Sequence, residues 1–408
     1  EVPFYMKVSS TGRFADSDYV LFYAQGPVSW TYTGSRFRHT RNPYSNYGCY
    51  FLISTQGEQK LLEPQRGEVP SDGNPDVLTL HNYQLHETDS INLVDTKGED
   101  GGGREWYGES FKSGVQRKFT FRFPHVMTAD MYCYVDVAAT SSAQSSFTFS
   151  NNGQESELFV SAKPGTAYTM ATVASSGEMF TSTNNEEQTV TLSYAASTDA
   201  STGYLNYIEL TAECEAVMQN GILYVRNPIY FKEPQKTRFR VKGATAETQV
   251  WNVSRVDSIY EVTSQIDGDE ILFLAGNDKV EEFVVINPSE YKGMSISPFT
   301  RQEQYREVAT QNLHAMENVD MVIISPQAFL PASRRLAAEH ERKDGFTTAV
   351  VTDEQIYNEF SSGTPDATAY RMLMKMLYDR AIVSGSEHKP KYLLLMGDGS
   401  FDNRKLAI

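Results

Sequence analysis

The chain has 408 residues, of which 40% are hydrophobic, and its formal net charge is −16. A chain of this length is too long for a single hydrophobic core and indicates two or three domains. The excess of acidic over basic residues makes nucleic acid a poor partner. No stretch approaches the roughly 18 apolar residues of a membrane-spanning helix, and three widely spaced cysteines without a Cys-x-x-Cys pair exclude a zinc ribbon or a dense disulfide scaffold.

The first 103 residues are predicted to form a β-rich region. Short apolar and aromatic runs at residues 19–23, 29–32 and 49–53 are separated by dipeptides that punctuate strands. From residue 63 to 103 the sequence becomes polar and rich in Gly, Pro and Asp, which predicts loops, above all at residues 100–103. The chain opens with neither a basic segment nor an apolar run, so we expect any targeting signal to lie outside this sequence.

Residues 104–220 are predicted to form an antiparallel β-sandwich. Runs of alternating polarity recur with Gly, Asn and Ser between them and without a helical period, as is typical of a sandwich or jelly roll. These runs lie at residues 118–123, 131–137, 146–149, 157–160, 189–194 and 207–211. Residues 221–300 repeat the pattern on a smaller scale and predict a second, small β-module.

From residue 301 onward, predicted strands alternate with predicted helices. A polar, helix-compatible stretch at 302–316 comes first; strands are then predicted at 320–325, 347–351 and 392–396, and helices at 330–343, 353–360 and 366–382. Gly345 is placed to stop the first helix, and Thr364 and Asp366 are candidate caps of the third. This order of elements requires right-handed crossovers and a parallel sheet.

The last predicted strand is expected to lead into a functional site. The run at 392–396 is typical of a strand buried on both faces, and Gly397-Asp398-Gly399 follow it at the edge where open α/β sheets place their chemistry. Only nine residues follow Gly399, fewer than a loop, a crossover helix and a further strand require. We therefore expect this sequence to hold the approach to an active site without the site itself, and further strands to cover the sheet edges.

These patterns together predict an α+β multidomain protein. Modules resembling β-sandwiches or jelly rolls are followed by a partial parallel α/β subdomain. The predicted divisions are a β-rich region at 1–103, a sandwich at 104–220, a small β-module at 221–300 and the α/β part at 301–408.

Several segments, taken as a set, resemble the gingipain-type cysteine peptidases. Residues 321–325, 336–346, 350–356 and 392–399 resemble the first half of their caspase-like catalytic domain. Residues 18–27, 42–45 and 103–111 resemble the β-rich region that precedes this domain in the branch of the type IX secretion sortases, or signal peptidases.

The resemblance implies a function and a location. The chain would be the amino-terminal part of a secreted peptidase or sortase that removes carboxy-terminal signals from secreted protein cargo and transfers the new terminus to an anionic glycolipid. It would act at the bacterial outer membrane, the cell surface or in the periplasm, with outer-membrane secretion components as partners. Members of this family use a Cys–His dyad, with the His in a Gly-His-Gly turn and the Cys at the end of a later strand.

No catalytic residue is predicted within this chain. It contains no Gly-His-Gly, and no Cys follows Asp320, so the α/β part lacks a nucleophile with a base in reach and is expected to have no turnover of its own. Cys214 lies between Glu213 and Glu215, whose charges are expected to raise its thiol pKa. The histidines of the β-rich part show no His-Glu-x-x-His spacing; they are His39, His81, His86 and His125.

Asp398, Ser400 and Asp402 alternate along the loop after the last strand, as oxygen ligands of Ca²⁺ often do. Because gingipain-type domains bind calcium, Asp398 and Asp402 are the predicted metal ligands, and no other cofactor is expected. The sixth position of the loop is Asn403, where an EF-type loop has Gly. The sequence favours the other interpretation, a polar loop whose carboxylates accept backbone N–H bonds.

Two alternatives to the peptidase interpretation remain. The first is a non-enzymatic cell-surface binding module in which the α/β part is only scaffold. The second is a glycan-binding sandwich that uses Trp30, Trp106 and Trp251, although aromatic side chains in a sandwich more often belong to its core.

Overall fold

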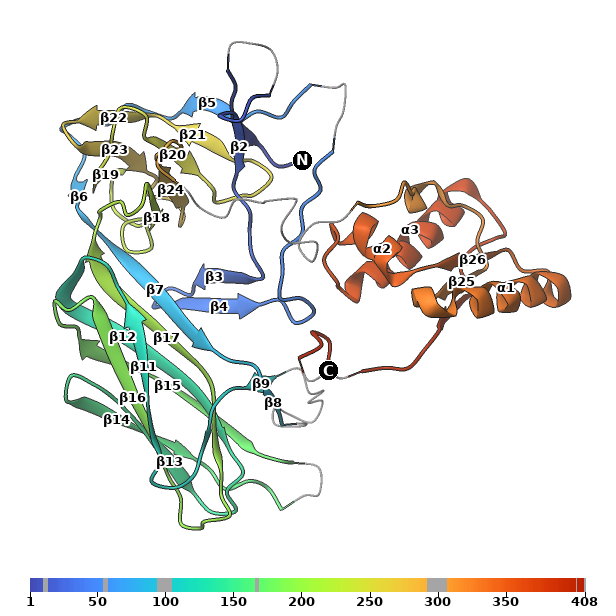
Figure 1. The fold of residues 1–408 in the computed structure, drawn as a ribbon, viewed down its shortest axis with the longest axis horizontal. Coiled ribbons are helices and arrows are strands. Elements are labelled where there is room, and N and C mark those ends of the chain that lie inside the picture. The colour runs from blue at the N-terminus through green and yellow to red at the C-terminus, as the bar shows by residue number, and fades with distance from the viewer. Residues whose placement is uncertain are drawn as a thin grey trace. The chain divides into compact units, whose positions relative to one another are not determined.

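The computed structural model describes residues 1–9, 14–53, 58–93, 105–165, 169–291, 307–400 and 402–406. The chain forms two compact units: a β unit of Glu1–Thr40 and Gly57–Ser295, and an α/β unit of Arg41–Gln56 and Ile296–Ile408. Figure 1 shows the strands of the first and the helices of the second. The predicted α+β multidomain fold class is confirmed. Across the described ranges, no helix has the length and apolar character that crossing a bilayer demands.

The larger sandwich of the β unit packs two antiparallel sheets face to face. One sheet has the order β10-β17-β12-β15 with β7 paired to β17, and the other has the order β11-β16-β13-β14. Along β16, Val190, Leu192 and Tyr194 are buried in the shared core while the residues between them are partly exposed, as expected for strands with one face inward. The strands are β7 (Thr79–Glu87), β10 (Ser110–Phe111), β11 (Gln116–Arg122), β12 (Val126–Ala139), β13 (Ser145–Asn151), β14 (Gln154–Val160), β15 (Thr172–Thr181), β16 (Glu187–Ala195) and β17 (Gly203–Glu215).

The smaller sandwich has sheets of order β18-β24-β20-β21-β5 and β22-β23-β19-β6. Its core includes the rings of Phe239, Phe273 and Phe283. Two strands from early in the sequence, β5 and β6, join it as parallel edges. The strands are β5 (Glu63–Arg66), β6 (Asp76–Val77), β18 (Ile222–Arg226), β19 (Thr237–Lys242), β20 (Gln249–Asn252), β21 (Tyr260–Val262), β22 (Ser264–Asp267), β23 (Glu270–Ala275) and β24 (Glu282–Ile286).

Three two-stranded ribbons complete the β unit: β1 (Phe4–Lys7) with β2 (Tyr19–Phe22), β3 (Val28–Tyr32) with β4 (Phe37–Arg41), and β8 (Ile91–Asn92) with β9 (Trp106–Tyr107). The first packs on the smaller sandwich, because Tyr5 and Leu21 share a cluster with Trp251.

The β3–β4 ribbon lies on the outer face of the larger sandwich, where the Trp30 and Tyr83 rings are 4.2 Å apart. The carboxylate of Glu209 accepts hydrogen bonds from Arg36 Nη1 and His39 Nδ1, each at 2.7 Å. The Glu209 side chain is only 2% exposed. A buried ion network therefore holds the ribbon in place.

The α/β unit is built on a parallel three-stranded sheet of order β26-β25-β27. Helix α1 (Leu330–Asp344) packs against Met321 and Ile323 on one face, and α2 (Asp353–Phe360) and α3 (Thr368–Ser384) pack against Val322 and Ile324 on the other. The strands are β25 (Met321–Ile324), β26 (Thr348–Val351) and β27 (Tyr392–Leu395), and the 3₁₀ turns are η1 (Leu313–Ala315) and η2 (Gln327–Phe329). Figure 1 shows this alternation of strands and helices.

The predicted helices and the parallel sheet are confirmed. Helix α1 ends at Gly345, whose φ of +67° is the left-handed conformation that a helix stop requires. The predicted caps of α3, Thr364 and Asp366, are wrong: the N-cap is Ala367, which makes no side-chain cap bond, although Asp366 accepts a hydrogen bond from the Thr368 nitrogen at 2.8 Å. In the helix-compatible stretch 302–316, residues 302–306 lie outside the described residues, and the described remainder contains only η1.

The prediction that the last strand is buried on both faces is wrong. Strand β27 is an edge strand with Tyr392, Leu393 and Leu395 exposed by 50%, 44% and 57%. Central strand β25 is the buried one, because β26 and β27 flank it. Among the described residues, none pairs with the outer edge of β27.

The stretch 63–103, predicted as loops, instead contains β5 to β8. Nine-residue β7 was missed because its sequence, Thr-Leu-His-Asn-Tyr-Gln-Leu-His-Glu, is mostly polar. The expected loop at 100–103 lies outside the described residues. The predicted four-part division stays a prediction; an unexpected feature is that Arg41–Gln56 belongs to the α/β unit, where Phe51 lies close to Gly363.

Candidate functional site

Three strand ends meet at the carboxyl edge of the parallel sheet, the edge at which open α/β sheets bind their ligands. Strand β25 leads into Ser325, β26 into Thr352 and β27 into Gly397. Gly397 has a φ of +129°, a conformation that side-chain-bearing residues rarely adopt. A Cβ there would lie 3.8 Å from Pro326 Cγ, so the turn after β27 runs close to the turn after β25.

Ser325 and Thr352 have structural roles at this edge. The fully buried hydroxyls of Ser325 and Ser333 are 2.8 Å apart. Thr352 caps helix α2, with its Oγ1 accepting from Gln355 N at 3.1 Å and its own nitrogen donating to the Gln355 side chain at 3.0 Å. This reciprocal capping box satisfies two donors at the start of the helix. Among the described residues, the hydrogen bonds of these hydroxyls join them to one another, to backbone carbonyls and to Gln355, and none is to an imidazole.

Asp398 is the exposed carboxylate that the structure places at this edge. Its Oδ1 accepts a hydrogen bond from the Gly399 nitrogen at 2.8 Å. Further along the loop Asp402 is buried, and its Oδ1 accepts from the Leu406 nitrogen at 2.8 Å.

These contacts bear on the predicted calcium site. The described residues contain no group of three or more His, Cys, Asp or Glu side chains able to hold a metal ion. Both Asp398 and Asp402 bind backbone N–H groups, as the polar-loop interpretation expects. The calcium site at Asp398 and Asp402 stays a prediction.

A buried carboxylate lies at the opposite, amino edge of the sheet. Asp320, 3% exposed, accepts hydrogen bonds from Thr347 N at 3.0 Å, His388 Nδ1 at 2.8 Å and Lys391 Nζ at 3.2 Å. Burial by itself would raise the pKa of Asp320, but these donors lower it to about 2. The cluster joins β25 to the segment that enters β27, so it stabilises the sheet and lies away from the carboxyl edge.

The three cysteines are free thiols, and Cys133 and Cys214 are buried. Burial, together with Glu213 and Glu186, raises the pKa of Cys214 to about 12. The predicted direction of this shift is therefore confirmed, although burial is its main cause and Glu186 contributes rather than Glu215.

The histidines pair with carboxylates. The ring nitrogens of five described histidines bind Asp or Glu, and none of these contacts is to a thiol. These pairs are His39 with Glu209, His86 with Glu109, His314 with Glu359, His340 with Asp344 and His388 with Asp320.

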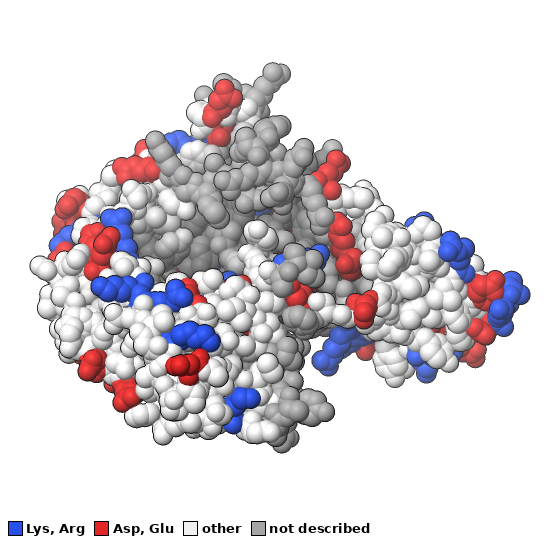
Figure 2. Space-filling model, turned by 60° about the horizontal axis from the view of Figure 1, so that its bottom comes forward, with Lys and Arg blue, Asp and Glu red and all other residues white. Residues whose placement is uncertain are grey.

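The tryptophans pack internally. Trp106 and Trp251 are 4% and 2% exposed, and the Trp30 ring lies on Tyr83 and 5.8 Å from the His39 ring. This favours the core interpretation of these side chains over a sugar-stacking role. On the face shown in Figure 2, acidic and basic side chains are interspersed.

Comparison with known proteins identifies the second unit's relatives. Residues 314–408 match the sequence model of peptidase family C25. A search of curated proteins found no match.

Among solved structures, the chain is similar to dimeric latent PorU from Porphyromonas gingivalis, with a TM-score of 0.81 and 23% identity over 99% of this chain and 37% of that chain. The resemblance to gingipain-type peptidases predicted from the sequence is thereby confirmed. The fold is that of the matching part of PorU, and the chain spans just over a third of the PorU chain's length.

Two carbohydrate-binding modules also match. The CBM36-1 domain of a xylanase from the hindgut metagenome of Trinervitermes trinervoides has a TM-score of 0.20 and 8% identity over 32% of this chain and 96% of that chain. A CBM36 module in complex with calcium and xylotriose has a TM-score of 0.21 and 12% identity over 33% of this chain and 99% of that chain. At these scores neither match carries an argument.

Proposed function

We propose that this chain is the amino-terminal region of a secreted, gingipain-like cysteine peptidase or sortase that processes the carboxy-terminal signals of type IX secretion cargo. The observation that carries this proposal is the PorU-like fold over 99% of the chain, joined to the peptidase family C25 match at residues 314–408. In this proposal the protein is exported and acts at the outer membrane, the cell surface or in the periplasm, where cargo and secretion components are its partners.

The parts of the chain have different tasks in this proposal. The carboxyl edge of the α/β sheet forms part of the floor of the active site, and the β unit positions this edge or presents cargo to it. The Cys–His dyad is supplied by sequence outside these 408 residues. Support for this division comes from the half-exposed β27, whose apolar residues suit an interior position in a larger sheet.

Peptidase activity is the first test. A longer gene product that includes these 408 residues is expected to cleave a cargo protein ahead of its carboxy-terminal signal, and the 408-residue chain alone is expected to leave the cargo intact. Mass spectrometry of the cargo gives the cleavage position. Cleavage by the short chain would contradict the assignment of the dyad, and a longer product that binds cargo without cutting it would favour the non-enzymatic binding module.

The role of Asp398 has its own test in the longer protein. Because Asp398 is exposed and its carboxylate accepts a hydrogen bond from the neighbouring Gly399 nitrogen, Asp398→Asn is expected to change the free energy of unfolding by less than about 0.5 kcal/mol. If the carboxylate helps to shape the floor of the site, kcat/KM should fall at least about tenfold. Ser384→Ala, at the end of α3, is the control. Unchanged kcat/KM in Asp398→Asn would remove Asp398 from the site.

A further inference from the structure

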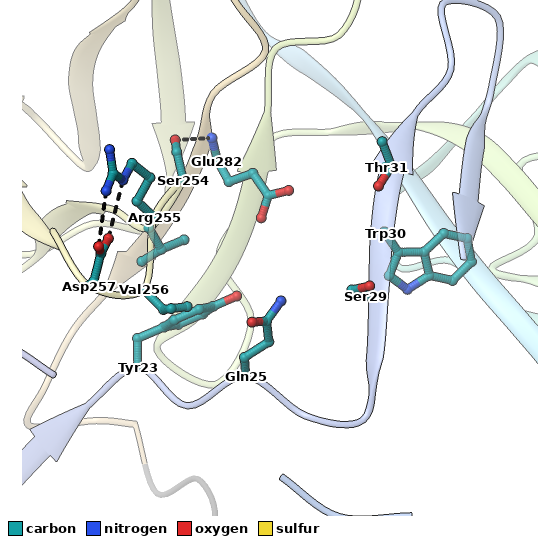
Figure 3. Close-up of a pocket in the computed structure, with 11 residues that line it drawn as sticks. Tyr23, Gln25, Ser29, Trp30, Thr31, Ser254, Arg255, Val256, Asp257 and Glu282 are labelled. Atoms are coloured by element: carbon teal, nitrogen blue, oxygen red, sulfur yellow. Dashed lines mark hydrogen bonds and ion pairs between the residues drawn. The ribbon is translucent and has the colours of Figure 1, made fainter. Parts of the chain in front are cut away.

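A cavity of about 490 Å³ lies in the β unit between β3 and the loop that follows β20. This volume falls within the range of roughly 300–1,000 Å³ that is typical of small-ligand sites. Figure 3 shows that side chains from three segments point into the cavity: residues 23–25, strand β3, and the region around Ser254 and Glu282. It belongs to neither sheet edge of the α/β unit.

One wall is the exposed face of β3. Because side chains alternate along a strand, Ser29 and Thr31 face the cavity while the Trp30 ring points away from it, as Figure 3 shows. The ring packs on Tyr83 at 4.2 Å on the sandwich side. The Ser29 hydroxyl donates to the Thr40 carbonyl at 3.5 Å and can still accept a hydrogen bond from a ligand. Both hydroxyls stand on a strand that is anchored from behind.

The opposite wall carries a fixed carboxylate. Glu282 points toward the centre of the cavity, and Arg226 Nε holds its Oε1 at 3.0 Å. The Glu282 backbone nitrogen donates to Ser254 Oγ at 2.9 Å. At the rim, Arg255 and Asp257 pair through two hydrogen bonds of 3.2 and 3.0 Å. The charges that line this wall are thus matched within the protein, which leaves no net charge to attract an ionic ligand.

The remaining side is formed by Tyr23 and Gln25. In Figure 3 the phenol ring of Tyr23 lies along the cavity and the Gln25 amide points into it. The lining therefore combines hydroxyls, a planar amide that both donates and accepts, an acceptor carboxylate and one aromatic face. Small-molecule pockets are usually lined mainly by apolar groups, so this lining suits a ligand covered in hydroxyls.

We propose that this cavity binds a neutral oligosaccharide. Sugar hydroxyls would donate to Glu282 and exchange hydrogen bonds with Gln25, Ser29 and Thr31, and the apolar face of a sugar ring would lie on Tyr23. The proposal does not depend on the peptidase proposal. It differs from the sugar-stacking alternative considered from the sequence, because no tryptophan ring enters this cavity in Figure 3.

Saturation-transfer NMR on the 408-residue chain tests the site, with maltotriose, cellotriose and chitotriose as probes. At least one trisaccharide is expected to receive saturation from the protein. Gln25→Ala should weaken its binding about five- to tenfold, the effect of losing one hydrogen bond of ordinary strength. Tyr23→Ala, which removes the aromatic face, should weaken binding by at least as much. Gln116→Ala, on an exposed position of β11, should leave the affinity unchanged.

Circular dichroism of each variant checks that the fold is kept. Binding of none of the three trisaccharides would overturn the proposal. So would an affinity that stays the same in both Gln25→Ala and Tyr23→Ala. Saturation of trialanine, with none of the sugars, would also overturn it by assigning the cavity to peptide.

Discussion

Replacing Glu209 by alanine is expected to destabilise the β unit by about 3–5 kcal/mol, the cost of removing one partner from a buried ion pair. The Glu209 carboxylate binds both Arg36 and His39, whose side chains are only 14% and 6% exposed. Without Glu209, Arg36 would lose its carboxylate partner in a site with little access to water, and His39 would keep only Glu87, at 3.6 Å. The guanidinium of Arg36 also lies 3.3 Å above the Tyr134 ring, so it cannot reach solvent without giving up that contact.

Unfolding in urea, followed by hydrogen exchange in β3 and β4, measures this loss. Glu215→Ala is the control on the same strand, because Glu215 pairs with Lys242 at an exposed position and should cost less than about 1 kcal/mol. Equal losses in the two variants would contradict a special role for the buried network.

The pH dependence of the native chain gives a second readout of the same network. Burial alone would lower the pKa of His39, but hydrogen bonds to Glu209 and Glu87 outweigh it and raise the pKa to about 9. The stabilisation from protonated His39 is therefore complete below its unfolded pKa of about 6.5 and is lost as the pH rises through about 9. In Glu209→Ala this alkaline loss of stability should be smaller, because Glu87 is then the only carboxylate of the pair left beside His39.

The helical part of the fold could be predicted from the sequence because its signals are local. Gly345 stops α1, and Asp366 binds the start of α3. The run that forms α2 contains neither Gly nor Pro, the residues that break helices. The parallel sheet follows from the order of these elements alone.

The pairing within the β unit could not be predicted, because it depends on contacts between distant positions. Glu209 and His39 are 170 residues apart, and on β17 Glu209 occupies the face that the alternation assigns to solvent. The ribbon β3–β4 covers that face, and no local sequence pattern predicts that it does so. Glu209 lies between the apolar residues Ile208 and Leu210, and a charged residue in such a position is the signal that could have drawn attention to it.

The candidate site was predicted in part. The position of Asp398 after a strand of the parallel sheet follows from the sequence, and the structure places it there. The burial of β27 was predicted wrongly. Five apolar or aromatic residues in a row indicate a strand that is suited to the interior of a sheet, but they do not identify the neighbouring strand that would cover it. The sugar cavity was not predicted, because residues 23–31 and 253–282 come together only through the tertiary fold.

Asp320→Ala is expected to destabilise the α/β unit by about 2–3 kcal/mol, because the buried carboxylate receives hydrogen bonds from two basic side chains and one backbone N–H. The Thr347 nitrogen loses its side-chain acceptor in the variant, whereas half-exposed His388 and Lys391 can turn to water. The loss should therefore be smaller than for Glu209.

The dependence of stability on acid pH distinguishes an electrostatic role of the Asp320 carboxylate from a role in packing alone. Since the pKa of Asp320 is lowered from 3.8 to about 2, its stabilisation is complete above about pH 4 and is lost as the pH falls through about 2. Protection from hydrogen exchange in β25 and β27 should therefore fall at acid pH in the native chain (the acid limb), and this fall should be smaller in Asp320→Ala. Asp379→Ala, which removes an exposed partner of Lys375 on α3, should cost no more than about 0.5 kcal/mol and keep the limb. An identical acid limb in native chain and Asp320→Ala would mean that the edge of the sheet is held by packing alone.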